Sequence, residues 1–294
     1  MKIPKPQYLL ITLLVFLSSL LCSCSSVRLA YNQTDFLLKW WIDDYIDLSS
    51  DQVELYDQAI SSIIKKHRLE ELPKALQKLR LLRTKLDQPL RIDDGVMVVK
   101  DIKSFSRDSI DLLLDESVNL ALMLQPKQIS HLENAFNKSN KKYQSDYLKG
   151  TPDEQFDKRL EKIIERTESI CGDLNKIQKL QIREIAKEYL LDMVSVYQAR
   201  LDKQQLIIKT LKKIVQDKPS ASQVKVALNQ LINDIEYGSS DEQKEFEKKR
   251  DLNSGAIITK ISELLDEKQR KKSQVKIQNW ESDIKVLIQY KSKS

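Results

Sequence analysis

The positions of glycine and proline constrain the fold of this chain more than any other feature. All five glycines lie between, or near the ends of, segments whose apolar residues recur every three or four positions: Gly95, Gly150, Gly172, Gly238 and Gly255. Four prolines stand at or near the expected starts of such segments: Pro73, Pro126, Pro152 and Pro219. Glycine commonly follows the last turn of a helix, and proline is favoured in the first turn. Because no convincing alternating run is present, we expect an all-α fold.

The same periodicity gives the bounds of the expected helices. They are 28–47, 50–71, 73–88, 94–123, 126–148, 152–171, 176–217, 221–237, 241–264 and 267–291. The stretch 95–100, "GVMVVK", comes nearest to a strand, but its apolar pattern continues as a helical one. The segment 176–217 would be about 60 Å long as one helix. We therefore predict an elongated multi-helix bundle with one long central helix.

Composition and charge exclude several classes of protein. With 294 residues, 41% of them hydrophobic, the chain can bury a core and is not disordered. Its net charge of +6 is small and the basic residues are interleaved with acids, so we expect no nucleic-acid partner. Only two histidines are present, without an HExxH pair, and no glycine-rich phosphate loop exists. The sequence therefore predicts no metal and no cofactor.

The N-terminus has the pattern of an exported lipoprotein. Lys2 and Lys5 precede an apolar run of fourteen residues, which is too short to span a bilayer comfortably, and no Ala-x-Ala cleavage site follows. Instead "LCSC" resembles a bacterial lipobox, which selects Cys24 as the lipidated first residue of the mature chain. Cys22 is the weaker acceptor because bulky Leu21 precedes it. Two or three acyl chains would hold the protein to a membrane permanently.

This interpretation predicts both the domain organisation of the chain and its location in the cell. Residues 1–23 would be the signal peptide and 24–294 an all-helical periplasmic body, with a possible sub-boundary near 150 or 218. By resemblance to Gram-negative lipoproteins, Ser25 after the acceptor points to the outer membrane, with the inner membrane as the alternative. A plain transmembrane anchor is the competing interpretation of the leader. Cys171, the remaining thiol, continues an apolar helical face, so we expect a buried core cysteine.

A short pattern, Leu-x-x-x-Gln, marks four expected helix starts. It occurs at Leu48, Leu124, Leu174 and Leu265. In the first copy Ser49 can cap the helix while Gln52 reaches back to the backbone N–H of Ser49. The pattern resembles the Leu-Thr-x-x-Gln motif of small periplasmic helical chaperones, although capping alone explains it.

The stretch 28–52, "RLAYNQTDFLLKWWIDDYIDLSSDQ", and "HRLEELP" at 67–73 are the most distinctive. With the lipobox they resemble a family of Gram-negative helical lipoproteins that has no assigned function. The residues that fit its pattern are Tyr31, Asn32, Trp41, Asp44, Tyr45, Asp47, Leu48, Gln52, His67, Arg68, Glu71, Leu72 and Pro73. The match is specific over the first fifty mature residues and only general beyond them. It departs at Lys66, where the family has an aromatic residue.

These residues can be interaction sites or supports of the core. We expect Asp44 to tether the first two helices through Arg68 or His67, because paired charges mostly hold elements in register. The apolar stripe formed by Leu37, Leu38, Trp41, Tyr45 and Leu48 predicts that the first helix docks on the bundle. The alternative is that Trp40 and Trp41 rest at the lipid headgroups. Either way, Tyr31, Asp47 and Glu71 are candidate interaction or structural residues.

Three functions remain open at this point. We expect a non-enzymatic binding or scaffolding module, held to a membrane by its lipid and contacting another envelope protein. The second candidate is a periplasmic chaperone that holds clients in a helical cradle, which an exposed apolar concave face would favour. The third is a murein-active enzyme, for which Asp115-Glu116-Ser117 is a superficial match. The apolar helix expected directly after Ser117 argues against the open loop that such a site needs.

Overall fold

The computed structural model describes residues 26–289, and the part it describes is built of helices without a strand. The first half contains α2 (Ser26–Asn32), α3 (Thr34–Ile46), α4 (Ser50–Lys66), the π-helical turn η1 (His67–Glu71), α5 (Leu72–Lys85), α6 (Ile92–Asp111), α7 (Leu114–Met123), α8 (Pro126–Tyr143) and the π-helical turn η2 (Gln144–Leu148). The second half contains α9 (Pro152–Cys171), α10 (Lys176–Tyr189), α11 (Met193–Asp217), α12 (Ala221–Tyr237), α13 (Asp241–Leu264) and α14 (Glu267–Gln289). The all-α prediction is confirmed. The signal peptide and Cys24 lie outside the described residues.

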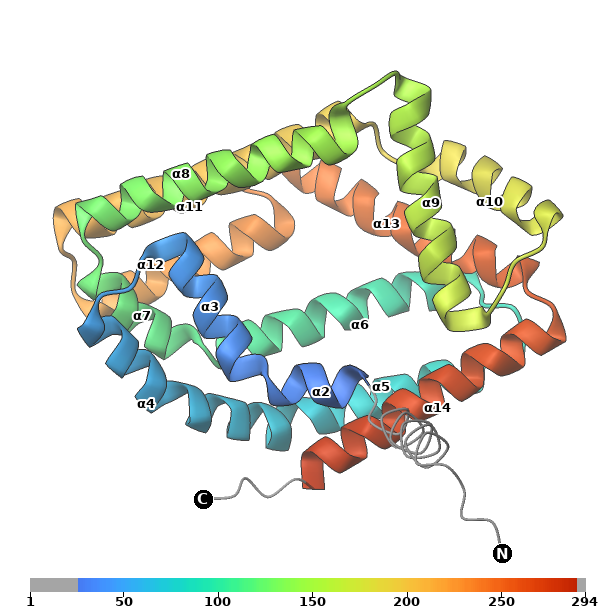
Figure 1. The fold of residues 1–294 in the computed structure, drawn as a ribbon, viewed down its shortest axis with the longest axis horizontal. Coiled ribbons are helices and arrows are strands. Elements are labelled where there is room, and N and C mark those ends of the chain that lie inside the picture. Colours follow the sequence, from blue (N-terminus) through green and yellow to red (C-terminus); the bar gives the residue numbers. More distant parts are fainter. Residues whose placement is uncertain (1–25, 290–294) are drawn as a thin grey trace, which may run out of the picture.

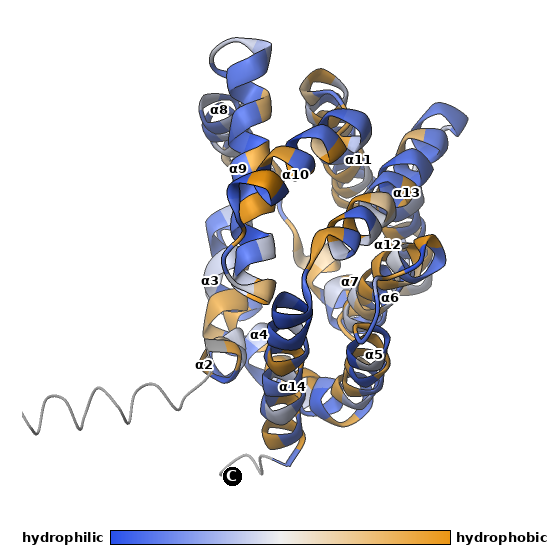
Figure 2. Ribbon diagram, turned by 90° about the vertical axis from the view of Figure 1, so that its right-hand side faces the viewer, coloured by the Kyte–Doolittle hydropathy of each residue, from blue (hydrophilic) through white to orange (hydrophobic). Residues whose placement is uncertain are grey.

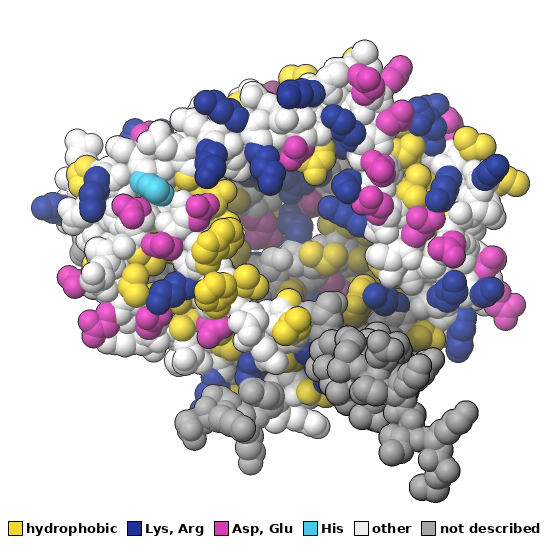
Figure 3. All heavy atoms as spheres, in the orientation of Figure 1, with side chains coloured by type: hydrophobic (Ala, Val, Ile, Leu, Met, Phe, Trp, Pro, Cys, Tyr) yellow, Lys and Arg dark blue, Asp and Glu magenta, His cyan; other side chains and the backbone are white. Residues whose placement is uncertain are grey.

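The helices frame a central opening (Figure 1). Helices α8 and α11 run along one side, α9 and α10 form one end, and α4, α5 and α14 run along the opposite side. Seen from the side, α2, α3, α8 and α9 lie in a layer on the left, the side that faces the viewer in Figure 1, and α6, α11, α12 and α13 lie to their right (Figure 2). The space-filling view shows that the surface is hollowed at the same place (Figure 3).

Several helix ends follow directly from the sequence. Thr151 accepts a hydrogen bond from the backbone N–H of Glu154, whose carboxylate accepts one from the backbone N–H of Thr151, at 3.3 and 2.7 Å. This capping box starts α9, and Gly172, with φ of +82°, follows its last residue. The predicted bounds 152–171, 221–237 and 241–264 coincide with α9, α12 and α13.

The predicted long central helix is wrong. The segment 176–217 is interrupted after Tyr189, where Leu190 adopts extended backbone angles, φ −71° and ψ 129°. Asp192 then caps a new helix, because its Oδ1 accepts the backbone N–H of Ser195 at 2.8 Å. These backbone hydrogen bonds also lower the pKa of Asp192 below its ordinary range. An aspartate cap within a segment that has neither glycine nor proline therefore ends one helix and begins another.

Other predicted helices are subdivided in smaller ways. The range 28–47 is divided at Gln33, and 94–123 is divided at 112–113. The ranges 50–71 and 126–148 pass from α-helix into the π-helical turns η1 and η2. The stretch 95–100 lies within α6, as predicted.

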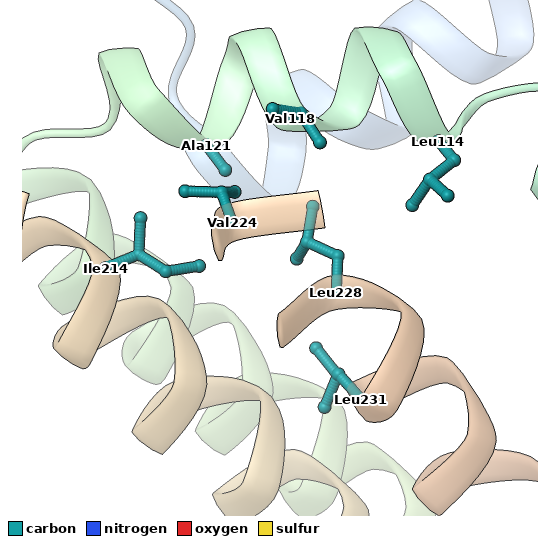
Figure 4. Close-up of a cluster of buried hydrophobic side chains, with 7 residues drawn as sticks. All are labelled: Leu114, Val118, Ala121, Ile214, Val224, Leu228 and Leu231. Atoms are coloured by element: carbon teal, nitrogen blue, oxygen red, sulfur yellow. The ribbon is translucent and has the colours of Figure 1, made fainter. Parts of the chain in front are cut away.

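The core of the described chain consists of several local clusters around the opening. In one of them Leu114, Val118 and Ala121 of α7 face residues of α11 and α12 (Figure 4). A second cluster contains Cys171 with Leu174 and Leu265. The Cys171 side chain is fully buried, and burial raises the pKa of its thiol to about 11, so the predicted core cysteine is confirmed.

Helices α6 and α13 approach each other at two glycines, Gly95 and Gly255, and Gly255 lies inside α13 rather than near a helix end as predicted. A Cβ atom on Gly95 would collide with the carbonyl oxygen of Gly255 and the side chain of Thr259. The absence of a side chain therefore permits this close backbone contact. It fixes α6 at the back of the central hollow.

Candidate functional site

The apolar face of α3 lies largely in solvent. Phe36, Leu37, Trp40 and Trp41 are 63%, 46%, 59% and 55% exposed, and no residue of α3 is buried. We call these four residues the aromatic face. Their spacing, i, i+1, i+4 and i+5, places them on one side of the helix. Figure 3 shows apolar side chains gathered over α3 at the edge of the central hollow.

The predicted docking of Trp41 is therefore wrong. Helix α3 contacts the body along its Tyr45 side, where the Tyr45 ring meets the edge of Phe136 on α8, with 5.7 Å between centroids. Trp41 lies beside Tyr45, at 5.0 Å, and leaves more than half of its surface in water. Leu38 and Leu48 are half-buried. Helix α8 covers the stripe only along its Tyr45 side, which is half-buried, and leaves Leu37 and Trp41 exposed.

The neighbourhood of the aromatic face is acidic. Residues 34–60 contain seven carboxylates and one lysine, in a chain whose net charge is +6. All seven carboxylate side chains are exposed: Asp35, Asp43, Asp44, Asp47, Asp51, Glu54 and Asp57. Among the described residues, Asp57 is the one carboxylate of the seven with an ion-pair partner, Lys39, at 2.8 Å. We call these seven residues the acidic group.

The negative charge of the acidic group affects the pKa of a neighbouring tyrosine, Tyr56. Tyr56 donates its hydroxyl to the backbone carbonyl of Asp35 at 2.8 Å, which joins α4 to α3. Burial, and to a smaller extent the charges of Asp35 and Asp57, together raise the pKa of Tyr56 to about 12. The acids of α3 and α4 therefore act on one shared surface.

Two buried glutamines connect the helices beneath α3. Gln52 and Gln128, each 1% exposed, exchange side-chain hydrogen bonds at 3.2 and 2.7 Å. Each side-chain oxygen also accepts the backbone N–H of its own helix cap, as the capping prediction requires for Gln52. The second amide hydrogen of Gln128 reaches the carbonyl of Asp47 at 2.9 Å, and that of Gln52 reaches the carbonyl of Met123 at 3.2 Å. The end of α3 is thereby joined to both α4 and α8.

The other two Leu-x-x-x-Gln copies form a second pair with the same bonding. Gln178 and Gln269 exchange side-chain hydrogen bonds at 2.7 and 3.1 Å. Their amides donate to the carbonyls of Leu264 and Asp173, at 2.8 Å in both cases. In each pair the acceptor is the residue just before the partner's motif leucine. Sequence reasoning missed this pairing, although a capping glutamine uses only its oxygen and leaves two amide hydrogens to satisfy.

Asp47 and Asp44 hold α3 through their backbone rather than their side chains. Asp47 adopts the left-handed region, φ 56°, which a residue other than glycine rarely occupies. The carbonyl of Asp44 contacts Nε2 of His131 at 3.0 Å. Within residues 26–289 no ion pair joins Asp44 to Arg68 or His67, so the predicted tether is wrong: α3 turns toward α8, and the Asp44 side chain is exposed.

His67 and Tyr31 do connect elements, in a separate cluster. The hydroxyl of Tyr31 lies 2.8 Å from Nδ1 of His67, and Nε2 of His67 lies 3.1 Å from the hydroxyl of Ser109. Burial lowers the pKa of His67, against a smaller opposing effect from Glu71, and burial raises the pKa of Tyr31. The Ser109 hydroxyl donates to the carbonyl of Phe105 at 2.7 Å. This chain of contacts joins α2, η1 and α6.

Arg68 and Glu71 complete the same cluster. Arg68 donates to the side chain of Asn32 at 3.3 Å and stacks over the Tyr31 ring at 5.4 Å. Glu71 is 4% exposed and accepts a hydrogen bond from Lys74 at 3.0 Å. The candidate residues therefore separate into two groups. Tyr31, His67 and Arg68 join α2 to the body, and Glu71 is buried close to His67. Trp41, Asp44, Tyr45 and Asp47 instead belong to the exposed arm α3.

The remaining candidate features have simple structural roles. Asp115, Glu116 and Ser117 lie in the first half of α7, whose other face enters the core through Val118 and Ala121. Within residues 26–289 no group of three or more His, Cys, Asp or Glu side chains is arranged to hold a metal ion. The same range contains no helix with both the length and the apolar character needed to cross a bilayer.

Comparison with known proteins identifies the family. Residues 44–243 match a family of unknown function, DUF6279. The chain belongs to this family. The matched residues begin within α3 and include α4, η1 and both partners of the first glutamine pair. No curated protein and no solved structure matches the chain.

Proposed function

We propose that this member of DUF6279 is an envelope lipoprotein whose helical body binds another polypeptide and carries out no reaction. The lipobox-like "LCSC" supports lipidation of Cys24, and Ser25 supports sorting to the outer membrane with the body in the periplasm. Residues 28–52 and 67–73, which resemble uncharacterised Gram-negative lipoproteins, support the same location in the envelope.

The exposed aromatic face is the observation that carries the binding proposal. Two tryptophans and a phenylalanine, all more than half exposed, stand together on a helix that contributes no residue to the core. A folded protein rarely leaves such a patch in water unless a partner covers it. Tryptophan is also enriched among the residues that dominate binding energy at protein interfaces. The glutamine pair beneath α3 gives this face a defined position.

Photocrosslinking in living cells tests this proposal. A photoreactive phenylalanine analogue replaces Trp40 in the full chain, and a matched chain carries it at Val194 of α11, which is 77% exposed. We expect discrete adducts with another envelope protein from position 40 and none from position 194. Equal labelling from both positions, or no protein adduct from position 40, would refute the assignment.

The anchor has its own test. Replacement of Cys24 by Ala should abolish metabolic labelling with palmitate and lipoprotein processing, whereas Cys22→Ala should leave both intact. Palmitate labelling that persists in the Cys24 variant and disappears in the Cys22 variant would show that Cys22 is the lipidated residue.

A chaperone is the second candidate, because the aromatic face borders the hollow of Figure 3. A chaperone would crosslink to many unfolded clients and suppress their aggregation, whereas a binding module would give one or a few adducts. The number of distinct adducts from position 40 therefore separates these two functions.

A further inference from the structure

We infer that the aromatic face and the acidic group together form a docking surface for an apolar polypeptide segment that carries basic residues, such as a cationic amphipathic helix. This inference rests on the proposed binding function and names the chemistry of the partner. The aromatic face would cover the apolar side of the segment, and the acidic group would contact its lysines or arginines.

The arrangement along α3 supports this division of roles. Phe36 and Trp40 are followed at helical spacing by Asp43, Asp44 and Asp47. The aromatic face thus continues as a row of carboxylates toward the start of α4. With thirteen residues, α3 is about 20 Å long, which matches about four turns of a partner helix.

The ion pairing of the acidic group differs from that of the body. Elsewhere half of the carboxylates, 18 of 36, have a cationic partner among the described residues, and they include the buried pairs of Glu281 with Arg83 and of Asp94 with Lys85. In the acidic group six of the seven carboxylates have no cationic partner among the described residues. Unpaired like charges around an apolar patch oppose self-association and favour a partner of opposite charge. They therefore select among apolar segments by charge.

The same charges argue against lipid as the occupant. Tryptophan at a bilayer surface is ordinarily accompanied by lysine or arginine, which are attracted to anionic headgroups. Here the surrounding charge is negative, so an anionic bilayer surface repels it. A basic polypeptide satisfies the aromatic face and the carboxylates at once.

Binding of two matched peptides tests the inference. The mature lipidated protein is purified and placed in nanodiscs of zwitterionic phosphatidylcholine. Fluorescence anisotropy then measures binding of an eighteen-residue amphipathic Leu/Lys peptide and of a Leu/Glu peptide with the same apolar pattern, each corrected with empty nanodiscs. We expect the Leu/Lys peptide to bind at least about tenfold more tightly, and this preference to shrink in high salt.

Variants assign the effect to the two parts of the surface. The triple change Asp43→Asn, Asp44→Asn, Asp47→Asn should remove the preference while preserving the fold, because asparagine tolerates the left-handed conformation at position 47. The control neutralises three exposed carboxylates on other elements, Asp146→Asn, Asp217→Asn and Glu242→Gln, and should leave the preference unchanged.

An aromatic pair of variants completes the design. Trp40→Ala with Trp41→Ala should abolish binding of both peptides. Ile177→Ala with Leu180→Ala, which removes two residues of α10 that are 68% and 64% exposed, should not.

Each contrary result has a defined meaning. Equal binding of the two peptides, lost in the tryptophan variant, would overturn the charge inference and leave the binding function standing. Binding of neither peptide would overturn the inference about the partner's chemistry. The proposed binding function is tested separately by the crosslinks from position 40. Quenching of tryptophan fluorescence by brominated lipid that disappears in the tryptophan variant would identify a membrane as the occupant. Self-association in sedimentation that disappears in the same variant would identify a second copy.

Discussion

The two glutamine pairs have the same hydrogen bonds and very different surroundings. Gln178 and Gln269 lie beside a core cluster that contains Cys171 and is covered by apolar residues of α9, α10 and α13. Gln52 and Gln128 lie beneath α3, a helix without a buried residue, and next to Asp47 in its left-handed conformation. The comparison indicates that the same hydrogen-bonded glutamine pair can join helices around a core cluster in one place and position an exposed helix in another.

The largest effect should come from the pair inside the core. Gln178→Ala removes the acceptor of the Asn175 N–H and leaves the carbonyl of Leu264 and the amide of Gln269 short of partners. Unsatisfied buried polar groups cost about 1 to 3 kcal/mol each, so we expect a loss of about 3 to 5 kcal/mol in the free energy of unfolding. Chemical denaturation followed by circular dichroism measures it. Gln58→Ala, at an exposed position on α4, is the matched control.

The pair beneath α3 should respond locally. Gln52→Ala removes the same set of bonds, but the end of α3 that lies over this pair belongs to a helix with no buried residue. Helix α3 can therefore move away and let water replace part of the loss. We expect a smaller loss of about 2 kcal/mol. Hydrogen exchange should rise in α3 and at the start of α4 before it rises in α10. Equal global destabilisation by the two alanine variants would show that the pairs do not differ as their surroundings suggest.

The sequence predicted the features that depend on neighbouring residues. Apolar periodicity, with glycines and prolines near helix ends, gave the bounds of α9, α12 and α13, because these signals lie within a few residues of the ends they mark. The capping role of Gln52 was predicted for the same reason. The break at Leu190 was missed, since Asp192 is an ordinary residue until its backbone angles make it a cap.

Features that depend on distant contacts were not predicted. The pairing of Gln52 with Gln128 joins residues 76 positions apart and has no local signal. The apolar stripe on α3 correctly showed which face is hydrophobic. It could not show whether another helix covers that face, and this is why Trp41 was assigned to the core.

The His67 cluster should give a modest dependence of stability on pH. Burial lowers the pKa of His67 in the folded chain, so the unfolded chain binds the proton first as pH falls. The contribution is therefore present above the ordinary histidine pKa of about 6.5 and is lost as the pH falls through that value toward the folded-state pKa. We expect the melting temperature to fall between pH 7 and pH 5, and His67→Gln to reduce that fall. His131→Gln, on α8, serves as control. If the melting temperature of the His67 variant depends on pH as that of the parent protein does, His67 is not the source of the pH dependence.

The smallest effect on stability should come from Trp41, one of the two tryptophans of the aromatic face. Trp41 is 55% exposed, and Tyr45 is its one ring contact among the described residues, so Trp41→Ala should lower the free energy of unfolding by less than about 1 kcal/mol. A tryptophan truncated in a core would cost about 3 to 5 kcal/mol. Ile182→Ala provides the buried comparison, because Ile182 is 1% exposed and such a truncation costs about 2 to 5 kcal/mol. A large loss in the Trp41 variant would show that α3 supports the fold. A small loss, together with the disappearance of crosslinks from position 40, would show that the exposed arm serves a partner and the glutamine pair beneath it serves the arm.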